Sequence, residues 1–116
     1  MATISRQLLS ASTNGRGVAV AATTSPGTII HTAPAGTTSM DEVYLYAANI
    51  GTADVLLVIQ HGGTSTSDEV DFTIPAGVGL VEIGGRLMIQ NGLVVRAYAG
   101  DANVINIFGH VNRIVA

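Results

Sequence analysis

MIQNGLVV, residues 88–95, contains the strongest local structural signal in the chain. Asn91 and Gly92 stand between two apolar runs, and a two-residue type I′ turn needs positive φ at both central positions, which these residue types tolerate best. The stretch therefore predicts a tight reversal between two β-strands. Because Gly84–Gly85 precedes it and AGDAN (99–103) follows it, we expect the C-terminal third to consist of antiparallel neighbours joined by short connections.

Outside this stretch, apolar residues recur at every second position or in short runs bounded by Gly, Pro, Asn and Asp, and no segment keeps a helical period over three turns. Such short, evenly spaced strands are typical of a sandwich or jelly roll. We predict an all-β fold, an antiparallel jelly-roll-like β-sandwich of about eight or nine short strands. The strands are expected over residues 17–22, 28–33, 42–50, 54–61, 69–74, 78–83, 86–90, 93–99 and 103–114.

The N-terminal residues differ from this pattern. Residues 1–16 are rich in Ser, Thr, Asn and Gly and carry one short apolar patch. They are expected to form an N-terminal arm, or a short lone strand around Ile4–Leu9, that a partner orders. Residues 17–116 are expected to form a single β-sandwich domain, because a chain of 116 residues suffices for one core and is too short for two.

The composition indicates a protein that is buried in an assembly. Only 11% of the residues are charged, against about a quarter in an average soluble protein. The net charge of −3 and the scattered Arg residues give no basic patch for nucleic acid. The apolar runs, such as Val55–Ile59, are far shorter than a membrane span and shorter than a signal-peptide core. Neither nucleic acid nor a membrane is therefore an expected partner, and synthesis in the cytoplasm is expected.

No pattern in the chain indicates catalysis, a metal or a cofactor. There is no Cys, and the motifs of serine hydrolases and phosphate-binding loops are absent. His31, His61 and His110 have no local zinc-ligand spacing, and TSDEVD (66–71) lacks the Gly and the oxygen spacing of a calcium loop. We expect no enzymatic activity, no catalytic residue, no metal ligand and no cofactor.

The closing segment AGDANVINIFGHVNRIVA, residues 99–116, has two different faces when it is placed on a strand. The odd-numbered positions from Ile105 to Val111 are expected to form a core stripe. The even-numbered positions from Val104 to Asn112 mix apolar with uncharged polar residues, which suits a subunit interface; the alternative is that this face packs on the polar arm of its own chain. The expected oligomer-interface residues are Tyr44, Tyr46, Arg96, Tyr98, Asn106, Phe108, His110 and Asn112.

Residues 70–114 resemble the C-terminal half of small virion proteins of tailed bacteriophages. The resemblance rests on TIPA at 73–76, on the pattern L-x-x-x-N-G-x-x-V-x-A at 87–97 and on the closing FGHVNRI at 108–114. The chain is also similar to head decoration or capsid cement proteins, which form β-rich, usually trimeric knobs between the major capsid subunits.

This resemblance implies a structural role on the capsid surface of a virion. It implies a homo-oligomer, most simply a trimer, that bridges subunits of the major capsid protein and strengthens the shell against internal pressure without chemistry. It also implies that the arm reaches neighbouring capsid subunits. The capsid contacts expected there are Ile4, Arg6, Leu8, Leu9 and Arg16.

Two alternatives stay open. Within the structural class, the alternative to the capsid role is a phage tail, baseplate or fibre structural component. In a different class, many β-sandwiches bind carbohydrate through aromatic residues in loops. Only 4% of this chain is aromatic, and all of these residues fall inside expected strands, which disfavours a carbohydrate-binding module.

Overall fold

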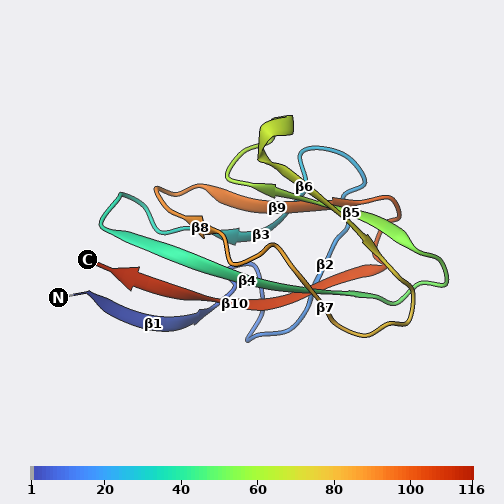
Figure 1. Cartoon of the computed structure of the whole chain (residues 1–116), viewed down its shortest axis with the longest axis horizontal. Helices are drawn as coiled ribbons and strands as arrows, with labels where there is room; N and C mark the ends of the chain where they lie inside the picture. Colours follow the sequence, from blue (N-terminus) through green and yellow to red (C-terminus); the bar gives the residue numbers. More distant parts are fainter. Residues whose placement is uncertain (1) are drawn as a thin grey trace.

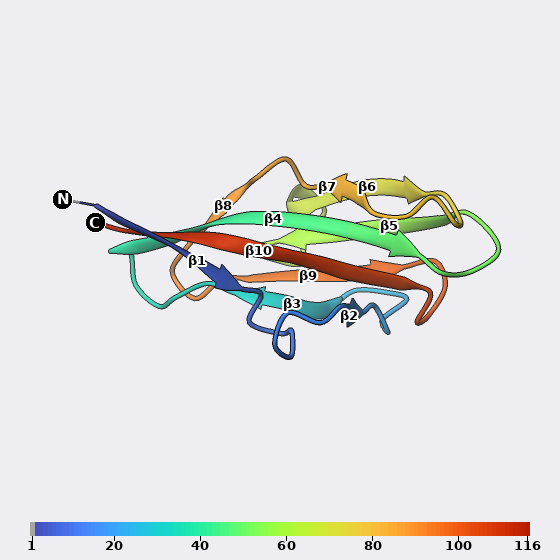
Figure 2. The same ribbon diagram turned by 90° about the horizontal axis from the view of Figure 1, so that it is seen from below.

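Two antiparallel β-sheets lie face to face in the computed structural model, which describes residues 2–116 (Figures 1 and 2). The six-stranded sheet has the order β1-β10-β4-β7, with β2 beside β10 and β8 beside β4. Its strands are β1 (Thr3–Leu8), β2 (Val18–Ala19), β4 (Ser39–Asn49), β7 (Val81–Ile83), β8 (Met88–Ile89) and β10 (Ile105–Val115).

The four-stranded sheet has the order β3-β9-β5-β6. It consists of β3 (Thr28–Thr32), β5 (Val55–His61), β6 (Glu69–Ile74) and β9 (Val94–Ala99), with one short 3₁₀ helix, η1 (Thr66–Asp68), between β5 and β6. The predicted all-β, antiparallel, sandwich-like arrangement is therefore confirmed, and each of the expected segments overlaps a strand.

The strand pairs are nested along the chain. β5 pairs with β6 at the centre, β4 pairs with β7 and β8 around this hairpin, β3 pairs with β9, and β10 closes against β1 and β2. Within residues 2–116, β5 and β6 are the single pair of consecutive strands that hydrogen-bond to each other. The chain thus resembles one long hairpin with β5–β6 at its closed end. Successive pairs along this hairpin lie alternately in the four-stranded and the six-stranded sheet.

The predicted reversal at Asn91–Gly92 is present, but the predicted pairing across it is wrong. Asn91 and Gly92 have φ angles of 63° and 70°, and Leu93 N–H donates to Gln90 O at 3.3 Å. β8 nevertheless pairs with β4, whereas β9 pairs with β3 and β5 in the other sheet. The nested order uses this turn to carry the chain between the sheets, so the strands of the C-terminal third are not neighbours of one another.

The core lies between the sheets and follows the two-residue period of the strands. On β10, Ile105, Ile107 and Val111 are fully buried, as the alternation of the closing segment predicts. Leu57 and Ile59 of β5 contribute from the four-stranded sheet. Burial of such aliphatic side chains, at about 25 cal/mol per Å² of apolar surface, is the main force that holds the two sheets together.

A buried polar link joins the sheets. His31 of β3 and Asp41 of β4, 1% and 0% exposed, are 2.6 Å apart between Nε2 and Oδ2. Ser10 N–H donates to the other ring nitrogen, Nδ1, at 3.0 Å, so the proton on Nε2 is the one donated to Asp41. Arg113 of β10 donates to the two carboxylate oxygens of Asp41 at 2.9 and 3.1 Å. Every hydrogen-bonding atom of this carboxylate therefore has a partner.

This link sets the ionisation of Asp41. Burial raises the pKa of the carboxyl, but the hydrogen bonds from Arg113 and His31 outweigh burial and hold the pKa below its usual 3.8. Asp41 is therefore a carboxylate at neutral pH, and the link spans β3, β4 and β10.

Residues 3–8, expected as part of an arm or as a lone strand, form the edge strand β1. β1 pairs with β10 over six positions, from Thr3 opposite Val115 to Leu8 opposite His110. Most of its side chains are exposed. Backbone hydrogen bonds rather than apolar burial therefore hold this strand to the sheet.

A candidate interface on the six-stranded sheet

One surface of the six-stranded sheet faces away from the core, and we call it the outer face. It consists of alternate residues of three adjacent strands, and the residues between them on β4 point into the core. Its members are Ile4, Arg6 and Leu8 of β1, Met40, Glu42, Tyr44, Tyr46 and Ala48 of β4, and Asn106, Phe108, His110, Asn112 and Ile114 of β10.

The pairing register arranges part of the outer face in rows across β1, β10 and β4. Successive rows are apolar, polar and mixed aromatic. They are Ile4–Ile114–Met40, Arg6–Asn112–Glu42 and Leu8–His110–Tyr44. One charge of each sign between apolar neighbours is closer to the composition of a protein interface than to that of a solvent-facing sheet.

Aromatic rings occupy the centre of the outer face. The rings of Tyr44 and His110 stack with their centroids 4.7 Å apart and their planes 10° from parallel. The guanidinium of Arg86 lies 5.5 Å from the centroid of the Tyr44 ring, a cation–π geometry. Tyr44 OH donates to Glu42 Oε1 at 2.7 Å. The chain itself therefore fixes these rings, which reduces the entropy lost when a partner binds.

Two of these central groups have shifted pKa values. The hydrogen bond to the Glu42 carboxylate, together with burial, raises the pKa of Tyr44 above its usual 10.0. Burial, followed by the positive charge of Arg6, lowers the pKa of His110 below its usual 6.5. At neutral pH both rings are uncharged, which is the state that a dehydrated interface favours.

The N-terminal segment of the chain touches the outer face at Phe108. A Cβ at Gly17 would lie 2.7 Å from Phe108 Cζ, so glycine allows the backbone to rest on this ring. β1, by contrast, lies beside β10 in the sheet and not over it. The alternative in which the N-terminal segment covers the last strand therefore applies at Phe108, whereas β1 extends the outer face with side chains of its own.

Six of the eight expected interface residues lie together on the outer face, and two do not. Arg96 and Tyr98 of β9 point outward from the four-stranded sheet, on the opposite side of the sandwich. Their neighbours Val95 and Ala97 are fully buried, which fixes this direction. Placing Arg96 and Tyr98 with the other six was wrong, because alternation separates the two sides of a strand but does not say to which sheet the strand belongs.

The five expected capsid contacts also separate. Ile4, Arg6 and Leu8 are exposed on the outer face, and Arg16 is exposed in the following segment. Leu9 is 2% exposed and belongs to the core. The expectation for Leu9 was wrong. Leu9 follows β1, and its aliphatic side chain is removed from water by packing in the core of its own chain.

The outward surface of the four-stranded sheet satisfies its polar groups within the chain. Gln60 of β5 is fully buried, accepts from Gly27 N–H at 2.9 Å, and donates to Ser25 Oγ at 2.9 Å and to Glu69 Oε2 at 3.1 Å. Tyr98 OH donates to the same Glu69 oxygen at 3.1 Å. Burial, followed by this hydrogen bond, raises the pKa of Tyr98 above 10.0. The polar groups around Gln60 and Glu69 are therefore paired within the chain.

The three histidines lie in three different places. His31 is in the link between the sheets, His61 Nε2 is 2.9 Å from Met88 O, and His110 stacks on Tyr44. Among residues 2–116, no group of three or more His, Cys, Asp or Glu side chains is arranged to hold a metal ion. In the same residues, no helix has the length and hydropathy needed to cross a membrane.

Several outer-face residues were missed by the sequence reasoning. Met40, Glu42 and Ile114 complete its rows, and continuing the alternation of the two long strands by a few residues would have found them. Two residues that adjoin the outer face, Arg86 over the Tyr44 ring and Met88 opposite Glu42, carried no such signal. β8 has only two residues, and its position depends on pairing with β4, far away in the sequence.

Comparisons of the chain with protein-family models, with curated proteins and with solved structures find no match.

Proposed function

We propose that the protein is a non-enzymatic structural subunit of a bacteriophage virion, a capsid cement or decoration protein. It forms homo-oligomers, most simply trimers, and binds the major capsid protein. The observation that carries this proposal is the outer face, where neutral aromatic and amide groups are flanked by apolar residues in one sheet surface. The resemblance of residues 70–114 to small phage virion proteins supplies the biological setting.

The outer face suits association with protein better than exposure to water. Interface cores are depleted in charge and enriched in aromatic side chains. Tyr44, Tyr46 and Phe108 supply the aromatic area, and Ile4 and Leu8, 68% and 55% exposed, extend the apolar surface to the edge of the sheet. Covering this face removes apolar area from water while most of the buried polar groups are uncharged.

The proposed mechanism is mechanical. An interface of standard size removes about 800 Å² of each partner from water. A protein that binds the assembled shell, and not its dissociated subunits, stabilises the shell by mass action. The subunit therefore acts through area and shape, and no chemical step is required.

The finer features of the fold belong to the same proposal. We infer a jelly-roll-like sandwich, and the nested strand pairs, with β5–β6 innermost and β1–β10 outermost, support it. We also infer that residues 1–16 act as an arm in the particle. The exposed side chains of β1 support this, since the strand can exchange the edge of β10 for an equivalent edge on a neighbour with little loss of buried apolar area.

Sedimentation of the purified chain tests the oligomer and its interface. Phe108→Asp and His110→Glu are each expected to convert the oligomer to a monomer, because the contact would bury an unpaired carboxylate. Leu56→Asp is the matched control, since Leu56 is 47% exposed on the outward surface of the other sheet, and it should leave the oligomer intact. A wild-type chain that is monomeric at micromolar concentration overturns the proposal. An oligomer that survives both outer-face changes overturns the assignment of this face.

Binding to particles separates the capsid role from its alternatives. The chain should bind shells of the major capsid protein of its source, and the Phe108→Asp variant should bind them more weakly. Binding to tails but not to capsids would instead assign it to the tail, baseplate or fibre. Clear binding on a glycan array that Tyr98→Ala abolishes would favour a carbohydrate-binding module.

A further inference from the structure

The chain contains two Asn-Gly pairs, Asn14–Gly15 and Asn91–Gly92. Both pairs are exposed, and each forms the centre of a turn in which both residues have positive φ. The φ angles are 54° and 86° at the first pair and 63° and 70° at the second. The two turns are thus matched in residue type, exposure and backbone conformation, but they differ in the hydrogen bonds that hold them.

An asparagine followed by glycine can lose its side-chain amide without a catalyst. The backbone nitrogen of the glycine attacks Cγ of the asparagine, a C–N bond forms, and the side-chain nitrogen leaves as ammonia. Water then opens the cyclic imide at either carbonyl, which gives aspartate or isoaspartate; one water is consumed and one ammonia is released. Glycine favours the attack because it has no side chain to hinder the approach of its nitrogen.

The attack needs a free backbone nitrogen and a peptide plane that can rotate out of the turn. A glycine N–H that is donated to a carbonyl keeps its proton and points away from Cγ. Rotation of the peptide plane also breaks the hydrogen bonds made within the turn or from it to other segments, which costs free energy. The hydrogen bonds of each turn therefore decide how readily its asparagine reacts.

The turn at Asn91–Gly92 is tied to a segment far away in the sequence. Gly92 N–H donates to Pro34 O at 2.9 Å, and Asn91 N–H donates to Gly36 O at 3.0 Å. These two bonds add to the hydrogen bond that closes the turn itself. The nitrogen that would attack in this pair is therefore already a hydrogen-bond donor, and the peptide plane is held against rotation.

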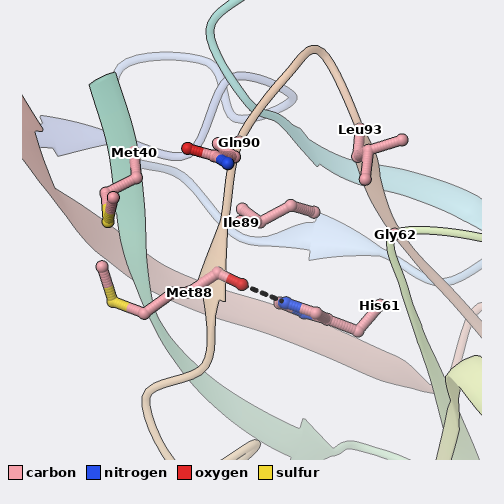
Figure 3. Close-up of a pocket in the computed structure, with 7 residues that line it drawn as sticks. All are labelled: Met40, His61, Gly62, Met88, Ile89, Gln90 and Leu93. Atoms are coloured by element: carbon pink, nitrogen blue, oxygen red, sulfur yellow. Dashed lines mark hydrogen bonds between the residues drawn. The ribbon is translucent and has the colours of Figure 1, made fainter. Parts of the chain in front are cut away.

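The chain on both sides of this second turn is also anchored. Gln90 and Leu93 flank the turn and line an apolar hollow of about 330 Å³ (Figure 3). Met88 lines the same hollow, and its carbonyl oxygen is 2.9 Å from His61 Nε2, as the dashed line in Figure 3 marks. Opening the second turn therefore disturbs packing as well as hydrogen bonds.

The turn at Asn14–Gly15 is held only locally. Within residues 2–116, its one backbone hydrogen bond runs from Arg16 N–H to Thr13 O at 3.0 Å. In the same part of the chain, neither Asn14 N–H nor Gly15 N–H has an acceptor. The nitrogen that would attack in this pair is therefore free, and one local hydrogen bond is lost when the peptide plane rotates.

We propose that Asn14 is a site of spontaneous deamidation in the folded chain, and that the fold protects Asn91 from the same reaction. The product adds a carboxylate to a chain of net charge −3, and isoaspartate also adds one carbon to the backbone between β1 and β2. The modified turn lies beside the outer face, since a Cβ at Gly15 would be 3.4 Å from Leu8 Cδ2. Deamidation of Asn14 thus changes both the charge and the length of the connection that follows β1.

Trypsin separates the two pairs, because the chain has no Lys and its Arg residues place each pair in a peptide of its own, 7–16 and 87–96. The purified folded chain is kept at mildly alkaline pH, and mass spectrometry of the two peptides follows the conversion of Asn to the acid. Asn14 should deamidate at least about tenfold faster than Asn91, the ratio produced when opening the second turn costs about 1.4 kcal/mol more. In the chain unfolded in urea, the two rates should become similar.

Two variants serve as matched controls. Asn14→Gln should abolish the early product, and Asn91→Gln should leave it unchanged. Equal rates at the two pairs in the folded chain, or a faster reaction at Asn91, would overturn the inference, as would an Asn14 that stays intact when the chain is folded but reacts when it is unfolded. A rate difference that persists in urea would overturn it too, because the neighbouring sequence and not the fold would then protect Asn91. The purified chain is followed without a partner, so the result is independent of the proposed function.

Discussion

The two outward surfaces of the sandwich differ in how far the chain itself pairs or covers their side chains. On the four-stranded sheet, buried Gln60 joins Ser25, Gly27 and Glu69, so the polar groups of that surface are paired by the chain itself. On the six-stranded sheet, the outer face holds its aromatic rings in order but leaves them partly exposed and uncharged. The centre of one surface pairs its polar groups within a single copy, whereas the centre of the other is a cluster of partly exposed aromatic rings.

This difference shows that an apolar residue on the outward side of a strand does not by itself mark an interface, because the chain can bury such a residue itself. Val58 on the four-stranded side is 4% exposed although it points away from the core. The outer face, by contrast, gathers its partly exposed rings into one stacked cluster around Tyr44 and His110, whereas the four-stranded sheet exposes separate aliphatic side chains such as Leu56. Substitutions that affect folding should therefore separate from those that affect association.

The largest effect is expected from the link beneath both surfaces. Asp41→Ala leaves the buried His31 and the partly buried Arg113 without their shared acceptor. We expect a loss of about 4 kcal/mol in the free energy of unfolding, typical of breaking a buried ion pair. Urea unfolding measures it. The exposed Asp71→Ala serves as control, with a change below about 0.5 kcal/mol, and an equally small change at Asp41 would contradict the role of the link.

The same link predicts a pH dependence. The pKa of Asp41 is lower in the folded chain than its usual 3.8, so the unfolded chain binds a proton first as the pH falls. The stability contributed by Asp41 is therefore complete above pH 3.8 and is lost as the pH falls through the folded pKa. Unfolding curves of the wild type and Asp41→Ala should converge in acid. Parallel curves throughout the acid range would show that Asp41 is not the group responsible.

A smaller loss of stability is expected on the outward surface of the four-stranded sheet. Gln60→Ala removes three hydrogen bonds and leaves the Gly27 N–H without its acceptor. The expected loss is about 3 kcal/mol of unfolding free energy, with no change in oligomeric state. Thr73→Ala, an exposed position on the same surface, is the control. Dissociation of the oligomer by Gln60→Ala at a concentration where it remains folded would break the distinction between the two surfaces.

Sequence alternation predicted the strands and their two sides, because side-chain direction is a local property of a strand. The core stripe of β10 and the six outer-face residues followed from it. The partner of each strand is not local: Asn91–Gly92 forms the expected turn, but the nested pairing sends β8 and β9 to different sheets. Arg96 and Tyr98 were misplaced for the same reason. Leu9 was misplaced because the polar residues around it in the sequence do not show that its side chain is buried in the core.

Gly17→Ala should shift the Phe108 ring on the outer face without changing any residue of that face. The added Cβ of Gly17→Ala would press on the Phe108 ring, which can shift, so the unfolding free energy should change by less than about 1 kcal/mol. The displaced ring should weaken association measured by sedimentation. Thr13→Ala, in the same exposed segment, is the control and should leave association unchanged. Equal association of both variants would remove Phe108 from the contact.

The smallest effect is expected from the titration of His110. Its pKa is lowered below 6.5 by burial and then by Arg6, so protonation favours the unfolded chain, and stability present above pH 6.5 is lost as the pH falls through the folded pKa. The effect on unfolding is small because the ring is still partly exposed. Covering the outer face buries the ring further, so the oligomer should dissociate over the same pH range more than the subunit unfolds. Sedimentation across this range measures it, and His110→Gln should remove the pH dependence. Persistence of that dependence in His110→Gln would assign it to another group.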